Sequence, residues 1–144
     1  MQKHILTVIC GAVGSLISNL LGGWNGAMST LLTFMIIDYL TGLAVAGIFS
    51  KSTKTETGKL NSTIGFKGLC KKCMIFVFVI IGYQLDKLLQ IDYVQNLVII
   101  SFIANELLSI IENAGLMGVP VPAVISKAID LLNRKESDTD GNSK

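Results

Sequence analysis

Residues 50–72 read SKSTKTETGKLNSTIGFKGLCKK and separate two long apolar runs. This basic segment holds six lysines and one acidic residue, Glu56, which gives it a local charge of +5 in a chain whose formal net charge is +2. Its lysines are Lys51, Lys54, Lys59, Lys67, Lys71 and Lys72. Because basic connectors resist translocation, the pattern predicts a topology-determining cytoplasmic loop between two membrane helices, in contact with an anionic lipid bilayer.

The composition of the whole chain also favours a membrane location. Of its 144 residues, 51% are hydrophobic and only 15% are charged, and the mean hydropathy is +0.60. No charged residue lies between His4 and Asp38, a tract too long for the surface of a soluble domain. Half of the twelve basic residues lie in the basic segment, so the slight positive balance is local and does not indicate nucleic-acid binding.

Hydropathy predicts an all-α integral membrane protein with about four transmembrane helices in a single membrane domain, residues 1–135. The helices are expected at about residues 4–21, 28–49, 72–89 and 94–112. Lys71 and Lys72 are expected to extend to the membrane surface at the start of the third helix.

A Gly- and Pro-rich stretch at residues 113–122 should end the fourth helix. An amphipathic helix is then predicted at residues 123–135, followed by a disordered acidic tail at residues 136–144. With the basic segment on the inside and four crossings, both termini are predicted to be cytoplasmic.

The sequence contains no recognisable catalytic constellation. The single histidine, His4, stands near the N-terminus, and the three cysteines, Cys10, Cys70 and Cys73, lack the further ligands that a zinc site requires. The C-K-K-C pair also lacks the βαβ setting of a redox motif. The chain is therefore predicted to have no enzymatic activity, no cofactor and no metal site.

Two carboxylates lie near the middle of apolar stretches, where insertion of a central Asp costs about 2.5 to 3.5 kcal/mol. Asp38 shares a helix face with the small residue Gly42, and Glu106 shares one with Ser109 and Asn113, with Asn105 beside it. The candidate assembly residues are Asp38, Gly42, Asn105, Glu106 and Ser109. Their faces either line an aqueous passage and hold an oligomer together, or form a structural network within one subunit.

Three strings occur together in this chain: IDYLTGLAVAG at residues 37–47, KTETGKLNSTIGFKGLCKK at 54–72 and FIANELLSIIENAGLMGVPVPAVI at 102–125. In combination they resemble the bacteriophage holins of the toxin-secretion or phage-lysis holin family. The resemblance covers roughly residues 22–132.

The resemblance implies a protein of the bacterial host's cytoplasmic membrane that forms a homo-oligomer, opens lesions at a set time and releases an endolysin for host cell lysis. It assigns no catalytic residues. The alternatives are an antiholin or regulatory membrane subunit and a holin-like protein for toxin export. Outside the family, a transporter and a membrane scaffold that uses the amphipathic helix also stay open.

Overall fold

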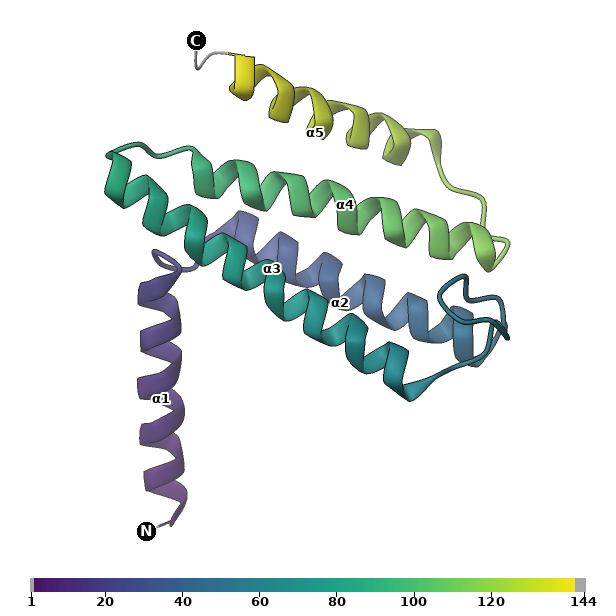
Figure 1. Ribbon diagram of the computed structural model, residues 1–144, viewed down its shortest axis with the longest axis horizontal. Coiled ribbons are helices and arrows are strands. Elements are labelled where there is room, and N and C mark those ends of the chain that lie inside the picture. Colours follow the sequence, from purple (N-terminus) through teal and green to yellow (C-terminus); the bar gives the residue numbers. More distant parts are fainter. Residues whose placement is uncertain (1, 142–144) are drawn as a thin grey trace.

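The computed structural model describes the backbone of residues 2–141 and the side chains of residues 3–132 and of Arg134. Within this range the chain forms five helices and no strand, which confirms the all-α prediction (Figure 1). The helices are α1 (Gln2–Leu20), α2 (Gly26–Gly47), α3 (Ser62–Leu89), α4 (Val94–Leu116) and α5 (Ala123–Gly141).

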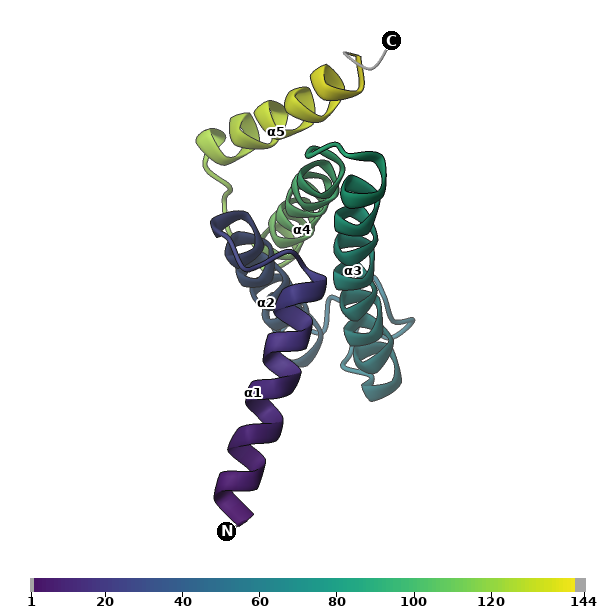
Figure 2. The same cartoon turned by 90° about the vertical axis from the view of Figure 1, so that its left-hand side faces the viewer.

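Helix α4 is the centre of the fold, because it packs against α2, α3 and α5. Helices α2 and α3 contact each other far less than each contacts α4, so α4 holds them together. Figure 2 shows this bundle from the end where α1 leaves it. The apolar core is formed by Leu21, Met28, Leu31, Met35, Ile75, Val79, Ile99 and Ile103.

The end of the bundle where α3 joins α4, called here the turn end, is closely packed. A Cβ added at Gly82 of α3 would lie 3.0 Å from the Cα of Gln95, so the backbones of α3 and α4 meet there. The side-chain amide of Gln95 donates a 2.7 Å hydrogen bond to the carbonyl of Leu21, and the ring of Tyr83 fills the space beside Gly22. These contacts fix the segment between α1 and α2 against the bundle.

Helix α1 projects away from the bundle and runs crosswise to α2, α3 and α4 (Figures 1 and 2). Of the other described helices it contacts only α3, near its own C-terminal end. Apolar side chains such as Ile5, Val8, Val13 and Leu16 are exposed on it. A helix of this composition is stable only if lipid or another protein surface covers it.

The structure corrects the predicted start of the third helix. Helix α3 begins at Ser62, ten residues earlier than the predicted residue 72, because the side chain of Asn61 caps its first turn by accepting from the backbone N–H groups of Thr63 and Ile64. The connector between α2 and α3 is therefore residues 48–61. It keeps Lys51, Lys54 and Lys59, whereas the other three lysines of the basic segment lie on α3.

Among the described helices, three are long and apolar enough to cross a membrane: α1 over Lys3–Leu20, α2 over Gly26–Gly47 and α4 over Val94–Leu116. Helix α3 is longer but is not one of these three. Its crossing, and with it the number of four crossings, stays a prediction.

Helix α5 packs on α4 through Ile129, which is buried, and Leu132, which is partly buried against the core. It continues to Gly141, six residues beyond the predicted end, because no Pro or Gly interrupts the chain between residues 123 and 140. The prediction of a disordered tail from residue 136 is thus wrong as far as Gly141. Residues 142–144, the rest of that tail, lie outside the described residues.

Candidate functional site

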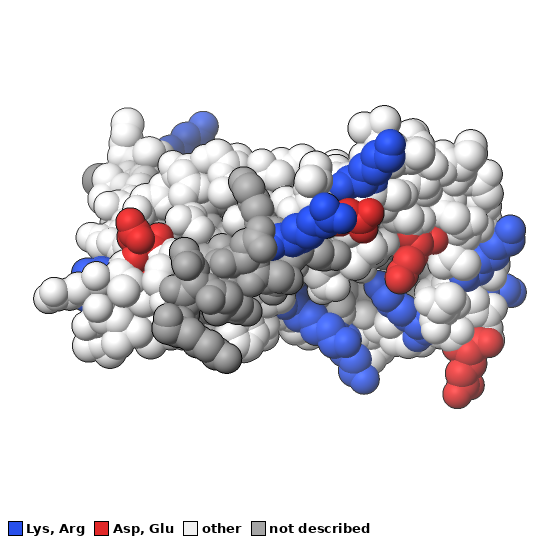
Figure 3. Space-filling view, turned by 90° about the horizontal axis from the view of Figure 1, so that it is seen from above, with Lys and Arg blue, Asp and Glu red and all other residues white. Residues whose placement is uncertain are grey.

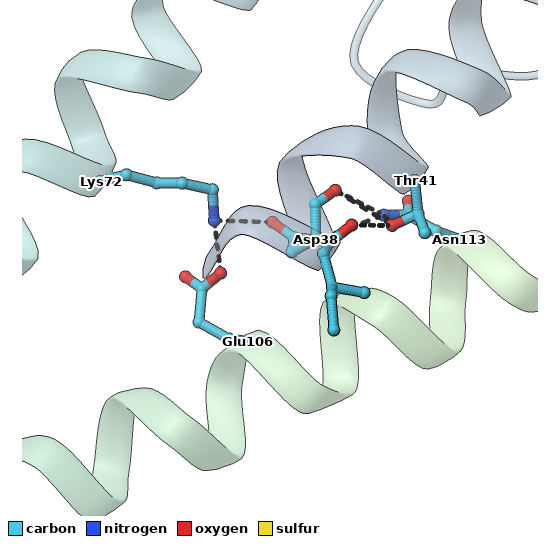
Figure 4. Close-up of polar contacts among 6 residues, drawn as sticks. Asp38, Thr41, Lys72, Glu106 and Asn113 are labelled. Carbon is cyan, nitrogen blue, oxygen red and sulfur yellow. Dashed lines mark hydrogen bonds and ion pairs between the residues drawn. The ribbon is translucent and has the colours of Figure 1, made fainter. Parts of the chain in front are cut away.

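Three charged side chains from three different helices meet inside the bundle: Asp38 of α2, Lys72 of α3 and Glu106 of α4 (Figure 4). The ammonium group of Lys72 lies 2.8 Å from Asp38 Oδ2 and also donates a hydrogen bond to Glu106 Oε2. These side chains are only 12%, 8% and 6% exposed for Lys72, Asp38 and Glu106. We call these three residues the charged layer.

Asn113 and Thr41 extend the charged layer by one turn. The amide of Asn113 donates to Asp38 Oδ1 at 3.1 Å and to Thr41 Oγ1 at 2.9 Å, and the Thr41 hydroxyl donates to backbone carbonyls of α2. Both carboxylate oxygens of Asp38 are therefore hydrogen-bonded (Figure 4). Within the described part of the chain, every buried side-chain nitrogen or oxygen has a partner.

The charged residues occupy core positions of a regular pattern. On α3, the residues Gly65, Gly68, Lys72, Ile75, Val79, Gly82 and Asp86 recur at alternating spacings of three and four, and all are buried or half-buried. On α2, Met28, Leu31, Met35, Asp38, Gly42 and Val45 follow the same spacing. This spacing places one side of each helix toward α4, so the ionic contacts lie in the seam that the apolar core also fills.

The charged layer is stabilised by pairing. A buried ion pair gains little over an apolar contact, but loss of one partner leaves an unpaired buried charge, which costs about 3 to 5 kcal/mol. Lys72 is the partner of both carboxylates. The integrity of the layer therefore depends on this one lysine more than on either acid.

A cavity of about 320 Å³ lies between the charged layer and the connector. Residues of α2, α3, α4 and the connector line it, among them all three members of the charged layer. The lining combines charged, hydroxyl and amide groups with aliphatic side chains such as Ile64 and Leu116. Polar groups of this kind can hold water, so the cavity can bring water to carboxylates near the middle of α2 and α4.

The turn end holds a third buried acidic group, Asp86 of α3. Its two carboxylate oxygens accept hydrogen bonds of 2.9 Å from the backbone N–H groups of Val94 and Gln95, the first residues of α4. A carboxylate at this position caps α4 and complements the positive end of its helix dipole. Asp86 therefore stabilises the start of α4 through backbone hydrogen bonds and not through an ion pair.

The structure brings two of the five candidate assembly residues, Asp38 and Glu106, into direct contact with one cation. Gly42 lies near the Asn113 amide, and Asn105 is exposed but lines the cavity. Ser109 is half-buried on α4 and is not among the hydrogen-bond partners of the charged layer within the described residues.

Sequence reasoning missed Lys72, which it placed in the basic segment at the membrane surface, and it missed Thr41. It placed Asn113 on the same helix face as Glu106 but did not count it among the candidate assembly residues. The spacing of three and four residues upstream of Ile75 is the signal that could have found Lys72. The three cysteines are exposed and unpaired. Over the residues that the structure describes, no cluster of His, Cys, Asp or Glu has a metal-binding arrangement.

Comparison with known proteins connects this arrangement to one family. Residues 15–134 match the bacteriophage holin family. The chain is 40% identical to an uncharacterized protein of Halalkalibacterium halodurans, over 94% of this chain and 99% of that protein. It is 34% identical to a probable holin of Bacillus phage phi105, over 78% of this chain and 76% of that protein. No solved structure matches the chain.

Proposed function

Because the chain belongs to the bacteriophage holin family, we propose that it is a holin that oligomerises in the cytoplasmic membrane of the bacterial host and forms lesions through which an endolysin is released. The endolysin is then a functional partner that passes the membrane and need not bind the chain. The proposed role requires no catalysis and no cofactor.

The observation that carries this proposal is the charged layer within helices that are otherwise apolar. In one copy, Lys72 neutralises part of the acidic charge and α4 covers it from one side. Polar groups on core positions are costly against lipid, but they are favourable where they face water or one another in an assembly. A bundle with such a seam is suited to both a lipid-embedded and a water-lining arrangement.

In the membrane we place the connector of residues 48–61 on the cytoplasmic side, since it is Lys-rich, and let α2, α3 and α4 cross. Pairing of Lys72 with Asp38 and Glu106 favours the crossing of α3, because the charge that lowers its hydropathy is then neutralised inside the protein. The crossing of α1 is part of the same proposal and puts both termini in the cytoplasm; it requires α1 to turn from its crosswise position about Gly22 and Gly23 until it lies along α2. Reporters fused at Met1 and at Lys144 test it, and an active periplasmic or extracellular reporter at Lys144 contradicts it.

Induction of the chain alone in a bacterium, with membrane potential and growth followed over time, tests the function. A holin is expected to cause abrupt depolarisation after a delay, and co-expressed endolysin should then lyse the cells. Continued growth at high expression contradicts the proposal, and delayed lysis by a second holin would indicate an antiholin. Passage of a toxin in place of an endolysin would indicate the export role.

Two neutral substitutions test whether the carboxylates take part. Asp38→Asn and Glu106→Gln, expressed separately, are expected to change the time of depolarisation, because each leaves Lys72 with one carboxylate fewer. Unchanged timing in both variants, at equal protein levels, removes the carboxylates from the mechanism.

A further inference from the structure

Two hollows meet along the seam between α2 and α3. One is the polar cavity next to the connector, and the other is an apolar groove of about 220 Å³. Both are lined by Tyr39 of α2 and Lys72 of α3, so the two hollows adjoin at these side chains. The seam is open because α2 and α3 are held together mainly through α4.

The polar cavity carries a positive charge that the chain itself does not neutralise. Three lysines and two carboxylates line it, so its formal charge is +1. Lys72 is engaged by both carboxylates, whereas Lys54 of the connector and Lys71 of α3 form no ion pair with any described residue. Their ammonium groups are available to an anion.

The apolar groove has the opposite character. Leu32, Ile36 and Leu40 follow one another at four-residue spacing along α2, and Cys73 and Phe76 form the opposite side on α3. Eight residues of helix correspond to about 12 Å along the axis. The groove therefore extends from the polar cavity toward the middle of the bundle and has the length and chemistry to hold part of a hydrocarbon chain.

A cationic cavity that continues into an apolar groove matches an anionic amphiphile. We propose that one anionic phospholipid occupies the seam, with its phosphate held by Lys54 and Lys71 and one acyl chain along the groove. A single phosphodiester charge would neutralise the +1 of the cavity. Basic pockets between membrane helices on the cytoplasmic side bind anionic headgroups. Such a pocket holds one lipid at a defined place, whereas surface lysines attract anionic lipids without a defined site.

Figure 3 shows that charged side chains gather over the half of the molecule that contains the connector, and that most of the remaining visible surface is uncharged. The proposal needs the membrane location but not lesion formation, so a binding measurement on purified protein can fail or succeed independently of the holin function.

The test uses the full chain in detergent micelles, with native mass spectrometry and thermal unfolding to follow added phosphatidylglycerol or phosphatidylcholine. Phosphatidylglycerol is expected to bind with one-to-one stoichiometry and to raise the unfolding temperature, and phosphatidylcholine is expected to bind far less. The double variant Lys54→Gln/Lys71→Gln should weaken phosphatidylglycerol binding roughly 30-fold, since each basic side chain near an anionic headgroup contributes a factor of about five.

The matched control is Lys51→Gln/Lys67→Gln, which removes the same charge from the same segment at two lysines that do not line the cavity. It should retain binding within about fivefold of the unchanged protein, because only diffuse attraction is reduced. If both double variants weaken binding equally, the lipid contact is diffuse and the proposal is overturned.

A second pair of variants tests the acyl chain. Cys73→Trp places a large ring in the groove and should weaken phospholipid binding more than tenfold, whereas Cys70→Trp, at an exposed position outside both hollows, should not. Glycerophosphoglycerol, which keeps the phosphodiester headgroup without the acyl chains, should bind much more weakly than phosphatidylglycerol. Equal affinity for the two, or an unaffected Cys73→Trp variant, would identify a soluble phosphate site and overturn the proposal.

Discussion

The two ends of the bundle both bury acidic side chains, but their partners differ. At the turn end, the carboxylate of Asp86 accepts from backbone N–H groups of α4, which are fixed by the helix itself. In the half of the bundle from the middle of α2 and α4 to the connector, called here the connector end, Asp38 and Glu106 are paired with one long, flexible lysine side chain. Backbone donors cannot move without unfolding α4, whereas Lys72 can change partners by rotation about its side-chain bonds.

Packing follows the same division. At the turn end, Gly82 permits backbone contact between α3 and α4, and Tyr83 fills the space beside Gly22. At the connector end, a cavity of about 320 Å³ is lined by residues of α2, α3, α4 and the connector and reaches the charged layer. The turn end is therefore suited to hold the helices in register, and the connector end is suited to rearrange.

The largest expected effect is at Lys72. Lys72→Met leaves two buried carboxylates without a cation and should lower the free energy of unfolding by about 3 to 5 kcal/mol. Chemical unfolding of the purified chain in micelles measures this, with Lys67→Met, at an exposed lysine of the same helix outside both hollows, as the control.

A further variant shows whether Lys72→Met destabilises the chain by leaving carboxylates unpaired or by removing packing contacts. The triple variant Asp38→Asn/Lys72→Met/Glu106→Gln removes all three charges and should recover most of the stability, since a neutral replacement of a buried ion cluster is often tolerated. If the triple variant is as unstable as Lys72→Met alone, the connector end is held by packing, like the turn end, and the comparison fails.

A smaller effect is expected at the helix contact of the turn end. Gly82→Ala places a Cβ 3.0 Å from the Gln95 Cα, so the backbones must separate, at a cost of about 1 to 3 kcal/mol. Gly68→Ala, on the same helix with nothing within 4 Å of the added Cβ, should instead stabilise by about 0.5 to 1 kcal/mol. Thermal unfolding of the two variants should show shifts of opposite sign in the unfolding temperature. Equal shifts would contradict the close contact between Gly82 and Gln95.

Removal of the α4 cap should have a still smaller effect. Asp86→Ala takes away two backbone hydrogen bonds at the start of α4 and should cost about 0.5 to 2 kcal/mol, whereas the exposed Asp92→Ala should cost almost nothing. Hydrogen exchange should locate the loss in the first turn of α4. Faster exchange around the charged layer would show instead that the two ends are coupled.

The smallest effect on stability is expected in the connector. Lys51→Gln/Lys59→Gln changes two exposed side chains and should leave unfolding within about 0.5 kcal/mol. Because the basic charge orients the chain, the same variant is expected to change the timing of depolarisation in cells. If both the timing and the topology are normal, the remaining lysines of the basic segment are enough to orient the chain, and the prediction for Lys51 and Lys59 is contradicted.

Hydropathy was enough to predict an all-helical membrane protein and to single out Asp38 and Glu106, because a carboxylate is conspicuous within an apolar stretch. It was not enough to predict Lys72. A lysine next to a Lys-rich, Gly-rich segment has the composition of a loop, and both of its acidic partners are 34 residues away in sequence. The long-range contacts decide its position, and only the spacing of three and four along α3 hints at them.

The position of α1 was likewise outside the reach of hydropathy, since a helix that lies crosswise and one that lies parallel to its neighbours have the same composition. What separates α1 from the bundle is the turn around Gly22 and Gly23, which both have positive φ. The extension of α5 to Gly141 was missed for a different reason. A charged sequence lacks apolar residues for a core, but it can still continue an existing helix.

The numbers of charges in the charged layer do not match, because one ammonium group serves two carboxylates. With both acids ionised, the three side chains of the layer carry a net charge of −1, while Lys54 and Lys71 line the same cavity on its connector side. Copies that bring their layers together would accumulate the negative charges of the layers in proportion to their number. A dry assembly would become less favourable with each added subunit, whereas one that admits water and small cations would not. Because each charged layer has two carboxylates for one ammonium group, a larger assembly is expected to need more water and small cations at this layer.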